Sequence, residues 1–219
     1  MSGWPGQPVI YEINTAVWLT ELSEVAGRRL TLADVTASAW DDVTPVGVDA
    51  VWLMGVWERS PAGLALAMAN PELQASFRDA LPDLTSSDVI GSPYCVRKYV
   101  VDAALGGPDA LAAARTALSD RGVRLLLDYV PNHVAPDHPW VSDDPKLFVR
   151  GDEDDIRSDP AGWIEREATY WLAGATRTSR RGRTSCNSTH FRRRCGLPQP
   201  RHWPESRPNV TASAVTWRC

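Results

Sequence analysis

Three polar residues that could take part in chemistry follow an apolar run: Asp128, Asn132 and His133 in "LLLDYVPNHVAPDHPW". A carboxylate among apolar neighbours must be paired, because burying an unpaired charge is costly. An imidazole at the exit of the run can donate a hydrogen bond to a hydroxyl group of a ligand. The pattern indicates a site for a polar ligand, but a loop-capping Asp and a solvated His explain the same residues.

The elements that must position these side chains are predicted strands. The runs "VIYEI" (residues 9–13), "VDAVWLMGV" (48–56) and "VRLLLDYV" (123–130) are apolar and short. The last two are nearly continuous, which is typical of strands buried on both faces. Ligands of parallel α/β folds bind beyond the carboxyl ends of the strands, where Asp128 and His133 are expected.

Helices are predicted between the strands. One begins at the N-cap Thr31 with Asp34 in its first turn, and another begins at Pro108 and ends at a left-handed Gly122. Their inward positions are Leu32, Val35 and Ala39, and then Leu111, Ala114 and Leu118. The alternation predicts an α/β fold with a parallel sheet. Residues 63–93, with one helix over 71–81, are too long for a plain connection and predict a functional loop.

Charge and periodicity divide the chain at residue 172. Of 27 acidic residues only Glu205 lies beyond it, whereas that tail holds ten arginines and no apolar pattern. We expect a folded part over residues 1–172 and a non-native or disordered basic tail over 173–219. No signal peptide and no run of 18 apolar residues is recognisable, so a cytoplasmic protein without a membrane partner is expected.

The string "DYVPNH" resembles the first signature of the alpha-amylase family, in which D-x-x-x-N-H closes the third barrel strand. "VIYEI" is similar to the first strand of that family, "GVDAVWLMGVWERSP" to its second strand and loop, and "GSPYCVRKYVVDAAL" to the approach to the signature. The resemblance covers residues 9–172. It implies the N-terminal part of a (β/α)8 TIM barrel, with about three strands, that acts on α-glucans or small α-glucosides by a retaining double displacement.

The resemblance also implies roles for individual residues. Tyr94 would stack on the sugar, His133 would contact its primary hydroxyl, and Asp128 would orient the active-site arginine. Asn132 aligns with a calcium ligand of many members, although it could equally satisfy a turn, and no other cofactor is implied. Lys98 stands where the family usually has Asp, which changes the charge near the expected pocket.

The catalytic carboxylates of the family are missing from the recognisable motifs. Retaining glycosidases need two carboxylates about 5 to 5.5 Å apart, one as nucleophile and one as acid/base. Neither D-G-x-R-x-D, which carries the nucleophile on the fourth strand, nor the later motifs occur. We therefore assign no catalytic residue and expect this truncated chain to be inactive.

Three interpretations fit the basic tail. A basic arm with Trp and Phe could bind nucleic acid, and Cys186, His190, Cys195 and His202 could bind zinc, although their spacing fits no zinc motif. The third is translation in a shifted frame. Read with one base restored, residues 174–182 permit G-D-P-Y-F-P-A-W, the next nine steps permit T-D-V-L-Q-L-N-A-F, and residues 210–219 permit D-G-V-R-C-D-M-A-M. Because the last block resembles the nucleophile region, a frameshift near residue 173 is favoured over nucleic-acid binding, and a catalytically dead sugar-binding protein remains an alternative.

Overall fold

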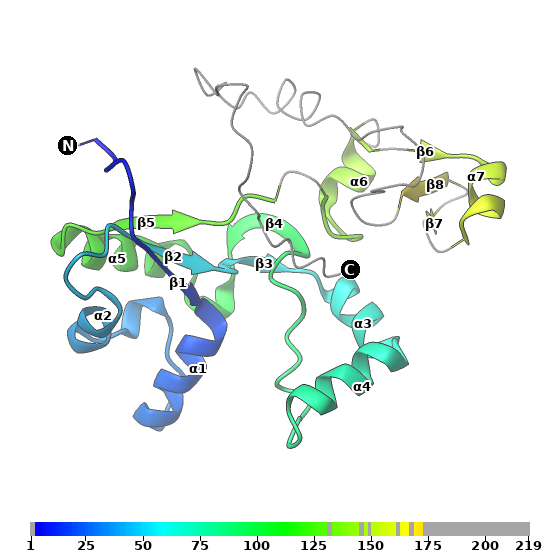
Figure 1. The fold of residues 1–219 in the computed structure, drawn as a ribbon. Helices are drawn as coiled ribbons and strands as arrows, with labels where there is room; N and C mark the ends of the chain where they lie inside the picture. Colours follow the sequence, from blue (N-terminus) through cyan, green and yellow to red (C-terminus); the bar gives the residue numbers. More distant parts are fainter. Residues whose placement is uncertain are drawn as a thin grey trace.

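Three parallel strands form the central sheet, in the order β1 (Ile10–Asn14), β2 (Ala50–Met54) and β5 (Arg124–Leu127) (Figure 1). The computed structural model describes residues 3–130, 133–144, 147–148, 150–160, 163–166 and 169–172. Register pairs Val51 with Tyr11 on one side and with Leu125 on the other. Strands adjacent in the sheet follow one another with helices between them, as in a (β/α)8 barrel. The predicted α/β fold with about three barrel strands is confirmed, while the tail lies outside the described residues.

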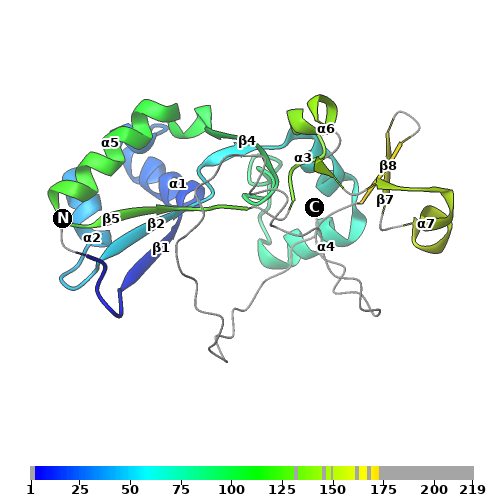
Figure 2. The same ribbon diagram turned by 90° about the horizontal axis from the view of Figure 1, so that it is seen from above.

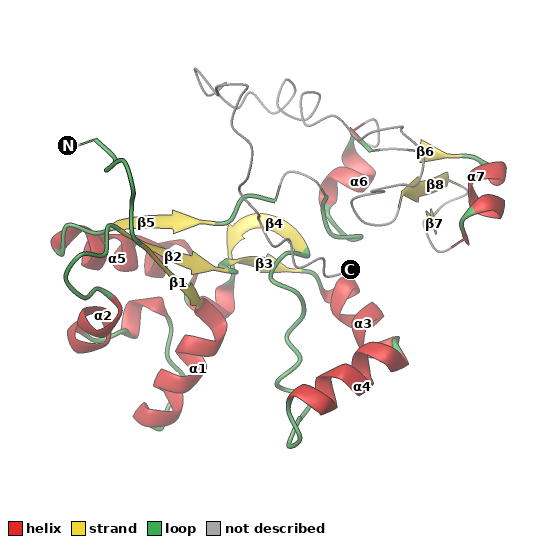
Figure 3. Cartoon of the chain, viewed as in Figure 1, coloured by secondary structure: helices red, strands yellow, loops and turns green. Residues whose placement is uncertain are grey.

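Helices cover one face of this sheet, as Figures 2 and 3 show for α1 and α5. The three that pack there are α1 (Thr15–Ala26), α2 (Ala37–Val43) and α5 (Gly107–Asp120). Leu19 of α1, Trp40 of α2 and Leu118 of α5 join Val51 and Leu53 of β2 in one buried apolar cluster. Burial of these side chains supplies most of the stabilisation that holds helices on strands.

The alternation of side chains along β2 separates the core from the site. Val51 and Leu53 are fully buried on the helix side, whereas Trp52 between them is half-buried and faces the other way. Leu125 and Leu127 of β5 likewise pack on the core, although β5 is half-buried and not buried on both faces as predicted. The difference arises because only β2 pairs with β5 among the described strands.

The helix predicted from Thr31 is wrong in its extent. Only a single 3-10 turn, Leu32–Asp34, follows Thr31, and the chain is extended at Val35 before α2 begins. Asp34 accepts hydrogen bonds from the amide and hydroxyl of Thr31, which lower the pKa of its carboxyl to about 2. Thr36 then caps α2 by accepting from the Ala39 amide, so two caps five residues apart divide the segment.

The predicted functional loop contains more structure than expected. The helix predicted over 71–81 is α4 (Pro71–Ala80), and α3 (Pro61–Ala69) precedes it. The sequence "PAGLALAMA" of α3 is apolar on all sides and shows no helical period, so only its Ser60 cap and Pro61 signal a helix start. A two-stranded antiparallel pair, β3 (Trp57–Arg59) with β4 (Val96–Val101), closes the loop next to the sheet.

The remaining elements lie after β5. In chain order they are α6 (Pro139–Asp143), β6 (Arg150–Gly151), α7 (Glu153–Ser158), β7 (Trp163–Arg166) and β8 (Thr169–Leu172). Strands β6, β8 and β7 pair antiparallel in that order. Among the helices of the described ranges, none combines the length and apolar character that crossing a membrane would require.

Candidate functional site

Asp128 is the centre of the candidate site, at the carboxyl end of β5. Its side chain is 6% exposed. Oδ1 accepts from the indole Nε1–H of Trp52 at 2.9 Å, and Oδ2 accepts from the amide of Gly55 at 2.5 Å. The indole Nε1–H of Trp57 donates to its backbone oxygen at 2.9 Å. The pairing expected for this buried carboxylate therefore comes from neutral N–H donors, and no arginine of the described ranges lies within ion-pair distance.

Gly55 can reach Asp128 because it lacks a side chain. Its φ of +80° is a left-handed conformation that favours glycine. A Cβ there would lie 2.7 Å from Cβ of Pro93 and 3.1 Å from a guanidinium nitrogen of Arg59. Burial lowers the pKa of Arg59, and the negative charges of Asp102 and Asp128 oppose that shift. Backbone and guanidinium thus pack closely over the carboxyl end of β2.

Tyr94 and His133, which the sequence places 39 residues apart, lie together in the structure. Nε2 of His133 is 3.1 Å from the backbone oxygen of Tyr94, so that nitrogen carries the ring proton and donates. Nδ1 is buried and has no hydrogen-bond partner among the described residues. Burial raises the pKa of Tyr94, and the negative charges of Asp128 and Glu12 raise it further. The proton that His133 was expected to donate to a sugar is thus engaged with the backbone.

Sequence reasoning missed Glu12, Trp52 and Trp57. Glu12 lies on β1 opposite Trp52 in the register, so both belong to the sheet face without helices. The only signal for Glu12 was a charge within the apolar run "VIYEI". The two tryptophans read as strand apolar residues, and nothing local indicates that their indoles donate to a residue more than 70 positions away.

The remaining predicted residues are not part of this contact set. Asn132 lies outside the described residues, as do Cys186, His190, Cys195 and His202. Over the ranges that the structure describes, no group of three His, Cys, Asp or Glu side chains could hold a metal ion. Lys98 lies opposite Glu58 in the β3–β4 register.

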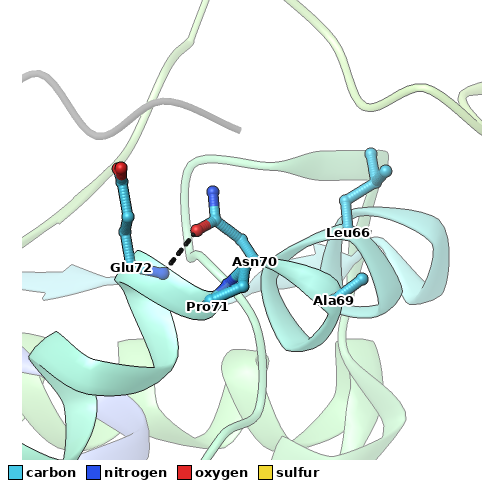
Figure 4. Close-up of a pocket in the computed structure, with 5 residues that line it drawn as sticks. All are labelled: Leu66, Ala69, Asn70, Pro71 and Glu72. Carbon is cyan, nitrogen blue, oxygen red and sulfur yellow. Dashed lines mark hydrogen bonds between the residues drawn. The ribbon is translucent and has the colours of Figure 1, made fainter.

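A surface depression of about 620 Å³ lies elsewhere, at the junction of α3 and α4 (Figure 4). Its lining residues are Leu66, Ala69, Asn70, Pro71 and Glu72. Asn70 uses its side-chain oxygen to cap α4, accepting from the Glu72 amide at 2.9 Å. None of Tyr94, Asp128 and His133 lines this depression, and the side-chain oxygen of Asn70 already caps α4. We therefore assign the depression no ligand.

Comparisons with known proteins give matches to solved structures. No protein-family model matches the chain, and no curated protein matches it. An alpha-amylase from Lactobacillus plantarum matches with 18% identity and a TM-score of 0.38, over 65% of this chain and 27% of that one. The acarbose complex of an alpha-amylase from Geobacillus thermoleovorans matches with 22% identity and a TM-score of 0.41, over 76% and 33%.

An inactive double mutant of MutB in complex with isomaltulose matches with 16% identity and a TM-score of 0.48, over 78% of this chain and 29% of that one. The chain thus spans between about a quarter and a third of the length of these proteins. At such identities and TM-scores, the function must be argued from the residues of this chain.

Proposed function

We propose that residues 1–172 form part of a glycosidase or transglycosidase barrel of the alpha-amylase type, which acts on α-linked glucosides by a retaining double displacement. We further propose that the 219-residue polypeptide does not itself cleave them. The substrate would be an α-glucan or a small α-glucoside, and the reaction needs no redox cofactor. The proposed roles are those expected above: Tyr94 stacks on the sugar and Asp128 organises the site. His133 would contact the sugar by turning its Nε2–H from the Tyr94 carbonyl to a sugar hydroxyl.

One observation carries the proposal: Tyr94, His133 and Asp128 gather at the carboxyl end of a parallel sheet. In barrel enzymes the loops at this end build the active site. Tyr94 contacts His133 and follows Pro93, which lies against Gly55, and the amide of Gly55 donates to Asp128. The three therefore belong to one region, although the sequence spreads them over 40 positions. An aromatic ring beside polar groups suits a sugar, which offers both apolar C–H surface and hydroxyls.

The chemistry of Asp128 supports the proposed inactivity. A nucleophile needs a free oxygen lone pair facing the substrate, and an acid must carry a proton. Both oxygens of Asp128 already accept hydrogen bonds, and its side chain is buried. We therefore give Asp128 a structural role and propose that the carboxylate pair required for double displacement is encoded in the restored reading frame.

The gene tests the frame proposal directly. We expect the nucleotides from codon 172 onward, read with one base restored, to encode the three family-like blocks, and the region beyond codon 219 to encode further barrel strands. A downstream sequence that spells neither would overturn this interpretation of residues 173–219.

Activity assays test the proposed function. The 219-residue chain should release no reducing sugar from maltotriose or soluble starch, whereas the frame-restored, extended chain should hydrolyse α-glucosides or transfer their glucosyl units. Turnover by the 219-residue form would refute the inactivity. Maltotriose binding without turnover by the extended chain would favour the dead sugar-binding alternative, and salt-dependent RNA binding by a monomer would favour the nucleic-acid one.

A further inference from the structure

We propose that Arg97 is a positioning residue. It fastens residues 133–138, the segment after β5, to β4 and thereby keeps His133 beside Tyr94. Its Nη1 pairs with Oε1 of Glu58 on β3, and its Nε lies 3.6 Å from Oδ2 of Asp137. One guanidinium thus joins three stretches that are distant in sequence. The sugar contact of His133 rests on the proposed function, whereas the fastening can be tested without any sugar.

Asp137 is anchored from a second direction, at the N-terminus of the nine-residue helix α3. The hydroxyl of Ser60 donates to its Oδ1 at 2.6 Å, and the amide of Ala62 donates to its Oδ2 at 3.4 Å. Ser60 is 3% exposed and also caps α3 by accepting from the Gly63 amide at 2.8 Å. A negative charge is favoured at this end of a helix. Asp137 therefore connects the segment after β5 to α3 as well as to Arg97.

The backbone of the fastened segment lies along β4. The amide of Ala135 donates to the carbonyl of Val96 at 3.1 Å, and Ala135 is completely buried. The amide of His138 donates to the Ala135 carbonyl at 3.0 Å. His133, two residues before Ala135, contacts Tyr94, two residues before Val96. The Ala135 amide therefore reports whether the segment that carries His133 is attached.

Because of its charge, Arg97 should contribute more to the attachment of this segment than either Glu58 or Asp137 does. Without the guanidinium of Arg97, Glu58 and Asp137 lose the cation that they share. The repulsion between their two negative charges then disfavours attachment of the segment to β4. The side chains of the three residues are 34%, 29% and 27% exposed, so water screens part of the effect. We expect a moderate change, roughly fivefold in the opening equilibrium of the segment.

Hydrogen–deuterium exchange of the 219-residue chain tests this inference. Arg97→Met should speed exchange of the Ala135 amide roughly fivefold, and Arg97→Lys, which keeps the charge, should restore part of the protection. The β2 amides should exchange as in the unchanged chain. The matched control is Arg28→Met, which removes an ion pair of 3.0 Å to Asp34 outside this network and should leave Ala135 unaffected.

A second readout follows the His133 ring, whose neutral form carries its proton on Nε2. Nitrogen NMR should show this tautomer in the unchanged chain and a mixture of tautomers in Arg97→Met. Three results would overturn the inference: no protection of Ala135 in the unchanged chain, an unaltered rate in Arg97→Met, or no difference between Arg97→Met and Arg97→Lys.

If Arg97→Met also unprotects β2, then Arg97→Lys and Glu58→Gln decide the matter. Slower opening in Arg97→Lys than in Glu58→Gln would support the shared cation, whereas equal or reversed rates would refute it. Because the exchange experiment uses no ligand, a negative result in it would not contradict the proposed sugar function. Likewise, an extended chain without activity would not contradict the role of Arg97 in attaching the segment.

Discussion

The amide of Gly55 donates to the carboxylate of Asp128 over 2.5 Å, although 73 residues separate them. This bond joins the ends of the two neighbouring strands β2 and β5 at the edge where the candidate site lies. Trp52 supplies the second donor, so the carboxylate is oriented by the strand beside it. The same contact that stabilises the sheet thus sets the position of this buried carboxylate.

Removing the Asp128 carboxylate should destabilise the chain strongly. Asp128→Ala leaves the Trp52 indole and the Gly55 amide without their acceptor, so we expect the free energy of unfolding in urea to fall by about 3 kcal/mol. Asp128→Asn, which keeps one acceptor oxygen, should cost about half of that. Asp41→Ala removes an exposed ion pair to Arg121 and serves as the control, with an expected cost of about 0.5 kcal/mol. Equal costs for the two alanine variants would contradict the role given to these donors.

Alanine substitutions at Gly55 and Gly47 should separate two costs to the free energy of unfolding, steric crowding and a left-handed backbone. Gly55→Ala must place a Cβ 2.7 Å from Pro93 in a backbone conformation with φ +80°. Gly47→Ala is a matched control, because Gly47 has φ +98° with nothing within 4 Å of the added Cβ. We expect about 1 kcal/mol for Gly47→Ala and about 3 kcal/mol for Gly55→Ala by thermal or urea unfolding. A smaller cost at Gly55 than at Gly47 would show that the crowding is relieved.

Stability should fall as the pH drops below about 6.5, because of His138. Burial lowers the pKa of His138 from its ordinary value of 6.5; Arg97 and Lys98 also lower it, and Asp137 and Asp143 oppose the shift. Its Nδ1 accepts from the Trp140 amide at 3.1 Å, which protonation would prevent. The unfolded chain therefore binds the proton more readily, so this contribution is complete above pH 6.5 and is lost as the pH falls.

Urea unfolding between pH 7.5 and 5 measures this dependence. His138→Asn keeps an acceptor for the Trp140 amide but cannot titrate, so its unfolding free energy should vary less over this range. Asp34 does not interfere, because its pKa of about 2 lies below the window. A slope that is as steep in His138→Asn as in the unchanged chain would assign the effect to other groups.

In the frame-restored, extended chain, the ring of Tyr94 should matter more than its hydroxyl. Tyr94→Ala removes the face on which the sugar is proposed to stack, and kcat/KM should fall about tenfold. Tyr94→Phe keeps that face and should lose little. If the two variants lose activity equally, the hydroxyl and not stacking is the functional part of Tyr94.

Local patterns located the strands and helices correctly where the apolar residues followed a single strand-like or helix-like spacing. The apolar runs located β1, β2 and β5, and the spacing of Ala114 and Leu118 with Gly122 located α5, where Gly122 has the predicted positive φ of 71°. The pattern missed α1, and it merged two separately capped turns into one helix after Thr31. Short polar caps decide such boundaries, and apolar periodicity does not register them.

The sequence by itself determined the fold class, the order of the strands and the residues that were expected at their carboxyl ends, because apolar runs and turn residues act over a few positions. Only the tertiary structure decided which donors hold Asp128, that His133 faces the Tyr94 backbone, and that Arg97 joins Glu58 to Asp137. These contacts connect residues about 40 to 76 positions apart. They depend on the fold bringing distant segments together, so their partners cannot be recognised from any local stretch of the chain.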